Sequence, residues 1–251
     1  MVGKLNTVSV GEMAGEFREY VMGVLNTFHA CSTQTIDLAA RTVVERLQAG
    51  GRFLITGTGH SHMLAEEFYT RAGGLACVTP VLPSEFQLFE HPLKSTEVER
   101  LEAYASVVMK LYSICGKDVI LIASNSGRNG MPVELARLSR SCGAAVIAFT
   151  SSNRAEGELS RHSSGLFLKD YADIVIDSCT PPGDAGFAVP GIDAYMGAMS
   201  TFTGTYMVQL MSILIARYMA ETDEILPVFK SSNIDGGDEW NEELFNRYLK
   251  V

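Results

Sequence analysis

The sequence predicts an α/β protein, a three-layer α/β/α sandwich around a five-stranded, doubly wound parallel sheet. Five short apolar runs rich in β-branched residues show little alternation of polar and apolar positions, which is typical of strands covered on both faces. Segments with helical spacing separate most of these runs, as in sheets built from alternating strands and helices. The expected strands are residues 52–57, 75–82, 118–124, 144–151 and 172–178.

Two amphipathic helices are expected before the first strand, over residues 12–30 and 36–47, because apolar residues recur there at helical spacing. The Ala-Gly-Gly of residues 49–51 supplies the stop signal. Further helical patterns cover residues 61–73, about 97–115, about 131–142, about 195–221 and 235–250. We therefore expect a helical extension at 1–30, one α/β domain at 31–221, and a tail at 222–251 whose short helix packs on a partner subunit.

Composition excludes several classes of function. The 251 residues are 47% hydrophobic and carry a net charge of −9, which argues against nucleic acid as a partner because phosphate backbones are bound by clustered Lys and Arg. No apolar run reaches the length of a membrane span. Five scattered cysteines form no CxxC pair and no signal peptide begins the chain, so we expect a cytoplasmic protein with reduced thiols and no membrane partner.

Two loops that follow expected strands carry the chemistry. Ligands of open parallel sheets bind beyond the carboxyl ends of the strands, and "GTGHSH" (57–62) and "SNSGRNG" (124–130) stand at two such ends, each before a helix. Helix N-termini, glycines and hydroxyls together suit a phosphate. Each loop alone could be only a turn and a helix cap, but two loops at one sheet edge favour a ligand. The candidate residues are Gly57, Gly59, His60, Ser61, Ser124, Asn125, Ser126 and Gly127.

A nucleotide is the less favoured ligand for the first loop. The dinucleotide fingerprint needs a third glycine where His62 stands, and no Gly-Lys-Ser/Thr of a phosphate-binding P-loop occurs in the chain. Glu85 lies at a plausible sequence distance for a ribose contact, which by itself is thin support. No cofactor is therefore expected.

The segments "GTGHSHMLAEEF" and "SNSGRNGMPVELARLSRSCGAAVIAFTS" resemble the two signature segments of SIS (sugar isomerase) domains, and the resemblance covers roughly residues 30–220. It implies the SIS fold, a phosphosugar ligand and a homo-oligomer, either dimer or tetramer. Phosphate contacts carry over to Ser61, Ser124, Ser126 and Asn129. The variant with "RHSSG" (161–165) is most similar to an uncharacterised bacterial group that carries phosphosugar or phosphoheptose isomerase labels.

Two characterised branches of that family differ in what they imply. Phosphoheptose isomerases share the G-x-G-x-S-H of residues 57–62, but Glu67 and Arg71 occupy the positions of a metal-binding His and Glu. No histidine follows His162, so we expect no metal. N-acetylmuramic acid 6-phosphate etherases have a Ser-Gly-Arg-Thr motif, which residues 126–129 resemble. They also have a Gly-Thr early in the last helix, which residues 204–205 resemble. The resemblance therefore leaves the reaction open.

An aldose–ketose isomerisation needs groups that move a proton between C1 and C2 of an open-chain sugar. The polar segment 84–102 makes Glu90 and His91 the preferred pair, although it could equally be a solvated connection. Glu134 and His62 are further catalytic candidates. The alternative for Glu134 is a carboxylate that stabilises the start of a helix, and the alternative for His62 is a surface pair with Glu66 on the same helix. His60, His162 and Thr203 are candidate sugar contacts.

Three functions remain open from the sequence. The preferred one is a sugar-phosphate isomerase; the alternatives are an etherase or lyase that acts on an amino-sugar phosphate, and a non-catalytic module that senses a phosphosugar.

Overall fold

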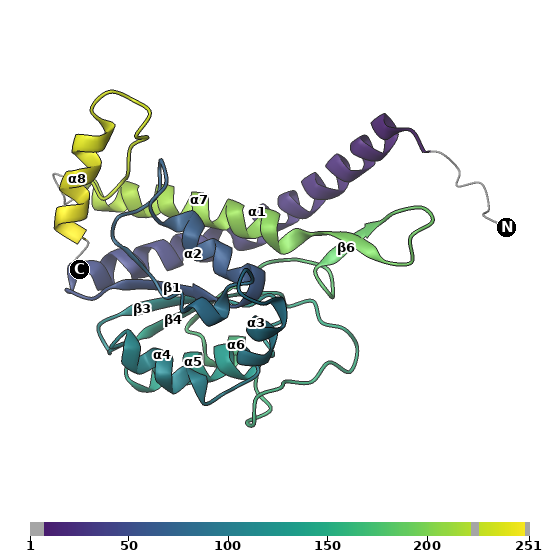
Figure 1. The fold of residues 1–251 in the computed structure, drawn as a ribbon, viewed down its shortest axis with the longest axis horizontal. Coiled ribbons are helices and arrows are strands. Elements are labelled where there is room, and N and C mark those ends of the chain that lie inside the picture. Colours follow the sequence, from purple (N-terminus) through teal and green to yellow (C-terminus); the bar gives the residue numbers. More distant parts are fainter. Residues whose placement is uncertain (1–7, 222–225, 249–251) are drawn as a thin grey trace.

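The structure, a computed structural model, describes residues 8–221 and 226–248 and has the predicted three layers (Figure 1). Its central sheet is parallel, with the strand order β2-β1-β3-β4-β5. All five strands fall within the predicted runs, which confirms the fold class. They are β1 Phe53–Gly57, β2 Val78–Pro80, β3 Val119–Ala123, β4 Ala145–Thr150 and β5 Ile174–Asp177.

One face of the sheet is covered by α1 Val10–Gln48, α2 Met63–Phe68 and α7 Met199–Met219. The other is covered by α3 Pro92–Val98, α4 Tyr104–Leu111, α5 Gly130–Ser141 and α6 Leu168–Tyr171. Neighbouring strand residues point to opposite faces, so the β1 residues Phe53 and Ile55 belong to the first core and Leu54 to the second. Burial on both faces explains why the strands read as unbroken apolar runs.

The N-terminal prediction of two helices is wrong, because α1 is one continuous helix that also crosses the expected domain boundary at residue 30. The polar stretch between the two apolar patterns does not interrupt it. The Ser32 hydroxyl donates to the carbonyl oxygen of Asp177 at 2.8 Å, which ties the helix to β5, and the Thr33 hydroxyl donates back to the carbonyl of His29. Hydroxyls of the kind that cap helix ends thus form hydrogen bonds from inside a helix.

Other predicted helices are shorter than expected. The helix expected over 61–73 consists of a 3-10 turn, η1 Gly59–His62, followed by α2. The pattern at about 97–115 contains α4, and α3 precedes it. The start of the pattern at about 195–221 is instead β7 Tyr195–Ala198, which forms an antiparallel hairpin with β6 Ala185–Ala188. Glycines weaken a strand signal, and the hairpin has Gly186 and Gly197 in its strands, so the pattern did not reveal it.

The predicted tail helix is α8 Gly237–Tyr248. Leu244 of this helix is fully buried against Phe229 and Ala76, and the indole nitrogen of Trp240 donates to the carbonyl of Val228 at 2.9 Å. The helix therefore packs on its own chain, and a contact with a partner subunit stays a prediction. Figure 1 shows α8 at one end of the molecule and the β6–β7 hairpin at the other.

By length and composition alone, α7 could cross a membrane, but it is a helix of the core that packs on α1 and the sheet.

The beginnings of β1 and β3 are joined by an ion pair whose carboxylate is buried. The Asp118 carboxylate, 2% exposed, accepts hydrogen bonds from the main-chain N–H and the guanidinium of Arg52 and from the N–H of Cys115. Burial alone would raise the pKa of Asp118, but these hydrogen bonds hold it below its ordinary value. The lowered pKa means that ionised Asp118 stabilises the folded state.

Replacing Asp118 with alanine is expected to lower the free energy of unfolding at pH 7 by about 2 kcal/mol, because hydrogen bonds to a charged group are lost. The contribution is present above the ordinary carboxyl pKa of about 3.9 and disappears as the pH falls through the lower pKa of the folded state. Urea unfolding at pH 7, 5 and 3 measures this. The variant should lose less stability than the parent between pH 5 and 3, and equal losses would contradict the assignment. Glu97→Ala, which removes an exposed ion pair with Arg100, is the control.

Candidate functional site

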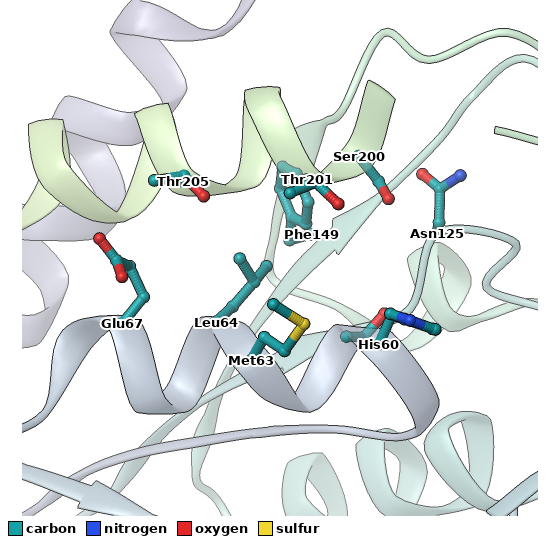
Figure 2. Close-up of a pocket in the computed structure, with 10 residues that line it drawn as sticks. His60, Met63, Leu64, Glu67, Asn125, Phe149, Ser200, Thr201 and Thr205 are labelled. Carbon is teal, nitrogen blue, oxygen red and sulfur yellow. The ribbon is translucent and has the colours of Figure 1, made fainter. Parts of the chain in front are cut away.

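A small pocket opens where the sequence places the two loops, beyond the carboxyl ends of β1, β3 and β4. One wall is η1 with α2, and the other is the first turns of α7 (Figure 2). The pocket has a volume of about 70 Å³ and is lined by both apolar and polar side chains. Its lining residues are His60, Ser61, Met63, Leu64, Glu67, Asn125, Phe149, Ser200, Thr201 and Thr205.

The first loop has its shape because of two glycines. A Cβ on Gly57 would lie 2.4 Å from the carbonyl oxygen of Ser61, so only glycine lets the η1 turn fold back on β1. Gly59 has φ +57°, and its N–H donates to the Ser95 hydroxyl at 3.0 Å. Helix α3 thereby fixes the loop, and His60 and Ser61 line the pocket.

The second loop presents an oriented amide. The side-chain oxygen of Asn125 accepts from the hydroxyls of Ser178 and Thr180 at 2.9 and 3.0 Å. Its NH₂ group has no partner among the described residues and remains available as a donor at the pocket. Gly127, at φ +59°, donates to the Ser124 hydroxyl at 3.3 Å. A second anion-compatible turn therefore stands beside the first.

The other predicted residues of this loop are placed differently. Ser124 is buried, Ser126 is half-buried, and neither lines the pocket. Asn129 is 6% exposed and accepts a hydrogen bond from Arg161 at 2.7 Å, so its amide oxygen is already engaged. A phosphate contact for these three residues stays a prediction.

Helix α7 presents hydroxyls to the pocket, but the candidate Thr203 is not among its lining residues. Thr203 is fully buried and donates to the carbonyl of Met199 inside its own helix. Thr201 and Thr205 line the pocket instead, with Ser200, whose hydroxyl donates to Asp184 at 2.7 Å. A Cβ on Gly204 would come within 2.9 Å of Leu64, so this glycine sets the close approach of α2 and α7.

Glu67 is the carboxylate of the pocket. Its Oε1 accepts from the Gln209 amide at 2.6 Å and pairs with the Arg71 guanidinium. Its Oε2 has no partner among the described residues, and Figure 2 shows the carboxylate on α2 facing α7. One oxygen is thus anchored and the other is available to a ligand.

The same contacts test the metal that the phosphoheptose isomerase branch implies. Glu67 and Arg71 stand at the positions of two of its ligands, and here they form an ion pair with each other. A guanidinium cannot coordinate a cation, so these residues do not fit a metal site of that kind. Within 8–221 and 226–248, no three His, Cys, Asp or Glu side chains gather as a metal-binding group.

The preferred catalytic pair lies outside the pocket lining. Glu90 is exposed and pairs with Lys94, whose hydrogen bond lowers the pKa of Glu90. His91 is also exposed, and its Nδ1 accepts from the N–H of Leu93 at 3.2 Å to cap α3. These contacts support structural roles, and catalytic roles stay predictions.

Glu134 and His162 do meet, but in a different cluster on the α5 side of the sheet. Arg137 binds both carboxylate oxygens of Glu134 at 2.7 Å and is the main cause of its lowered pKa. The buried His162 ring bonds Glu134 at 3.0 Å through Nε2 and Ser164 at 2.7 Å through Nδ1. Both ring nitrogens are engaged, which supports a role in holding the 160–165 loop.

His62 is likewise turned inward. Its side chain is 8% exposed, Nδ1 lies against the carbonyl of Gly59, and Nε2 is 3.3 Å from Glu66. Through Gly59 it holds the first loop from the side away from the pocket, whereas His60, two residues earlier, is exposed and lines the pocket. A catalytic role for His62 stays a prediction.

One half-buried carboxyl beside the first loop was not among the candidates. Glu99 accepts from the Thr58 hydroxyl at 2.9 Å, and burial raises its pKa, while that hydrogen bond, Arg161 and Arg100 lower it in part. A raised carboxyl pKa next to a ligand loop is typical of functional sites. The only signal in the sequence was its membership of the polar segment 84–102.

Comparison with known proteins agrees with this architecture. The SIS domain model matches residues 16–151. A UPF0309 protein of Halalkalibacterium halodurans is 44% identical over 95% of this chain and 100% of its own, and one of Thermoanaerobacter pseudethanolicus is 38% identical over 94% and 97%.

Solved structures with a similar fold include two phosphoheptose isomerases. Those from Francisella tularensis and Neisseria gonorrhoeae both have a TM-score of 0.52 and 15% identity. The matches cover 84% of this chain and 100% of the first protein, and 82% and 98% for the second. At this identity the likeness concerns the fold.

Proposed function

The chain belongs to the SIS domain family, and from that premise we propose that it binds a phosphorylated sugar in the pocket between α2 and α7 and interconverts its aldose and ketose forms. The two isomerases of similar fold support the class of reaction. The observation that carries the proposal is Glu67, a carboxylate held at one oxygen and open at the other, beside two phosphate-compatible loops.

Neutral donors hold the phosphate in this proposal. The Asn125 amide, the Ser61 hydroxyl and the hydroxyls of Thr201 and Thr205 surround the pocket. Pre-oriented amides and hydroxyls bind a dianion without a local lysine, which is consistent with the acidic composition of the chain. The volume of about 70 Å³ fits only part of the ligand, so the sugar extends out of the pocket past His60.

Proton transfer follows from the carboxylate and the histidine of the pocket. The free Oε2 of Glu67 takes the proton from C2 of the open-chain aldose, and the electron pair moves to the carbonyl oxygen to give an enediolate. His60 donates a proton to that oxygen to complete the enediol. His60 then takes the hydroxyl proton from O2 while Glu67 returns its own proton at C1, which gives the ketose. Protonation sites move while atoms and charge balance, as general acid–base catalysis requires.

Removing the Asn125 amide tests ligand binding. Asn125→Ala is expected to weaken glucose 6-phosphate binding about 10-fold, because a hydrogen bond to a charged group is lost. Isothermal calorimetry and the ligand-induced rise in melting temperature measure this. Asn26→Ala, on the exposed face of α1, is the control. If the parent bound glucose and glucose 6-phosphate with equal affinity, the proposal that this pocket recognises the phosphate group would be wrong.

The turnover products separate the isomerase from its alternatives. Lactate released from N-acetylmuramic acid 6-phosphate would indicate an etherase. Tight phosphosugar binding with no exchange of carbon-bound hydrogen would indicate a sensing module.

A further inference from the structure

A second and larger pocket lies at the far end of α2, where the chain after that helix faces the segment before α8 and α8 itself. Its volume is about 520 Å³, within the range of pockets that bind small molecules, roughly 300–1,000 Å³. We propose that it binds a second small molecule, a hydroxylated anion such as a phosphorylated or carboxylated sugar, and that Arg71 couples it to Glu67.

The pocket is built on rigid chain. The Asn241 side chain, 8% exposed, accepts from the N–H of Lys230 and donates to the carbonyl of the same residue, both at 2.9 Å. A Cβ on Gly237 would lie 2.2 Å from the carbonyl oxygen of Ser231, so the turn into α8 is closely packed. Lys230 also lies over the Trp240 ring, 4.2 Å from its centroid. These contacts hold α8 and the segment before it together as one wall of the pocket.

The lining has the chemistry of a site for an acidic sugar. Arg71, whose side chain is 49% exposed, and the exposed Lys230 are available to an anionic group. The carboxylates of Asp238 and Glu242 can each accept two hydroxyl hydrogen bonds. Phe245, 38% exposed, offers a ring face against the sugar. Cations and carboxylates in one pocket favour a ligand that carries both an anion and donor hydroxyls.

Arg71 connects the two pockets. It lines the second pocket, while its Nη1 pairs with the Glu67 oxygen at the first. An anion in the second pocket competes with Glu67 for this guanidinium. Occupancy of the second pocket therefore changes the charge balance at Glu67, and by linkage the state of Glu67 changes affinity at the second pocket.

Trp240 provides the readout, because it is the only tryptophan of the chain and stacks on Lys230 of the pocket. The full chain is titrated with glucose 6-phosphate, gluconate and inorganic phosphate while tryptophan emission is recorded. We expect a saturable change with glucose 6-phosphate or gluconate and a weaker response to phosphate alone. Glu242→Ala should weaken it by about 10-fold, whereas Glu243→Ala, on the exposed side of α8, should not.

The coupling has its own test with the same readout. Glu67→Gln removes the charge that holds Arg71, so the affinity reported by Trp240 should rise by roughly 5-fold or more. Unchanged affinity would overturn the coupling. Absence of a saturable change with all three probes up to millimolar concentration, or an equal response in Glu242→Ala, would overturn the site.

This inference stands apart from the proposed function. Asn125→Ala should leave the gluconate titration of Trp240 unchanged, since Asn125 belongs to the first pocket and gluconate carries no phosphate for that pocket to hold. A response that disappears in Asn125→Ala and persists in Glu242→Ala would place the ligand in the first pocket and reject the second site. If the protein shows no isomerase activity, the Trp240 titration still decides whether the second pocket binds a ligand, because it does not depend on turnover.

Discussion

Replacing Glu67 with glutamine should reduce the exchange of carbon-bound hydrogen in a bound sugar phosphate by about 10³-fold, because general-base catalysis typically contributes 10²- to 10⁴-fold. The substitution keeps the size of the side chain and an oxygen that can accept from Gln209. It removes the base at the open position of the pocket, together with the charge that pairs with Arg71. Incorporation of deuterium in deuterated water, at C1 of a 2-keto sugar phosphate and at C2 of the aldose formed from it, measures the effect when NMR follows a panel of such substrates.

Two controls decide what a loss of exchange means. Glucose 6-phosphate should still bind to the first pocket of Glu67→Gln within a few-fold of the parent, since the substitution removes the base and not the phosphate donors. Glu90→Gln and His91→Ala should retain exchange if Glu67 is the base. If exchange survives in Glu67→Gln and disappears in those two variants, the catalytic pair is Glu90 and His91 of the polar segment 84–102, and Glu67 is not the base.

The sheet was predictable because each strand is buried on both faces. A run such as Val119–Ala123 has no polar position, and only a covered parallel strand explains that pattern in so short a segment. The β6–β7 hairpin has no comparable signal. Its strands are half-buried or exposed, and its glycines 186 and 197 make room for Tyr20 and Phe17 of α1. Contacts between segments so distant in sequence are not visible in local periodicity.

The candidate site was predictable to the level of its loops but not of its side chains. Both loops lie where the carboxyl ends of β1 and β3 place them. The direction of the Asn125 amide, however, is set by two hydroxyls beyond β5. The resemblance places Glu67 at the position of a metal ligand, and its hydrogen bond from Gln209 of α7 joins segments too far apart in sequence for a local pattern to reveal. Glu134 was a catalytic candidate and His162 a candidate sugar contact, and the sequence did not reveal that the two side chains bond to each other.

The second prediction with a large effect concerns the first loop, where Gly57→Ala should abolish detectable binding of sugar phosphates. The new Cβ would lie 2.4 Å and 2.5 Å from the carbonyl oxygen and carbon of Ser61. Backbone atoms cannot rotate away as a side chain can, so η1 must move and carry His60 and Ser61 with it. Overpacking of this kind costs about 1–3 kcal/mol of stability, which thermal unfolding measures beside calorimetric titration with glucose 6-phosphate.

Two other glycines separate this clash from general effects of alanine. Gly59 has φ +57°, and a Cβ there would meet only the Ser95 hydroxyl at an unstrained 3.7 Å, so Gly59→Ala should cost about 1–2 kcal/mol through backbone strain alone. Gly23 lies in exposed α1 with no atom within 4 Å, and Gly23→Ala should stabilise by up to about 1 kcal/mol. If Gly57→Ala bound glucose 6-phosphate as tightly as Gly23→Ala does, the close return of η1 onto β1 would not be what forms the phosphate site.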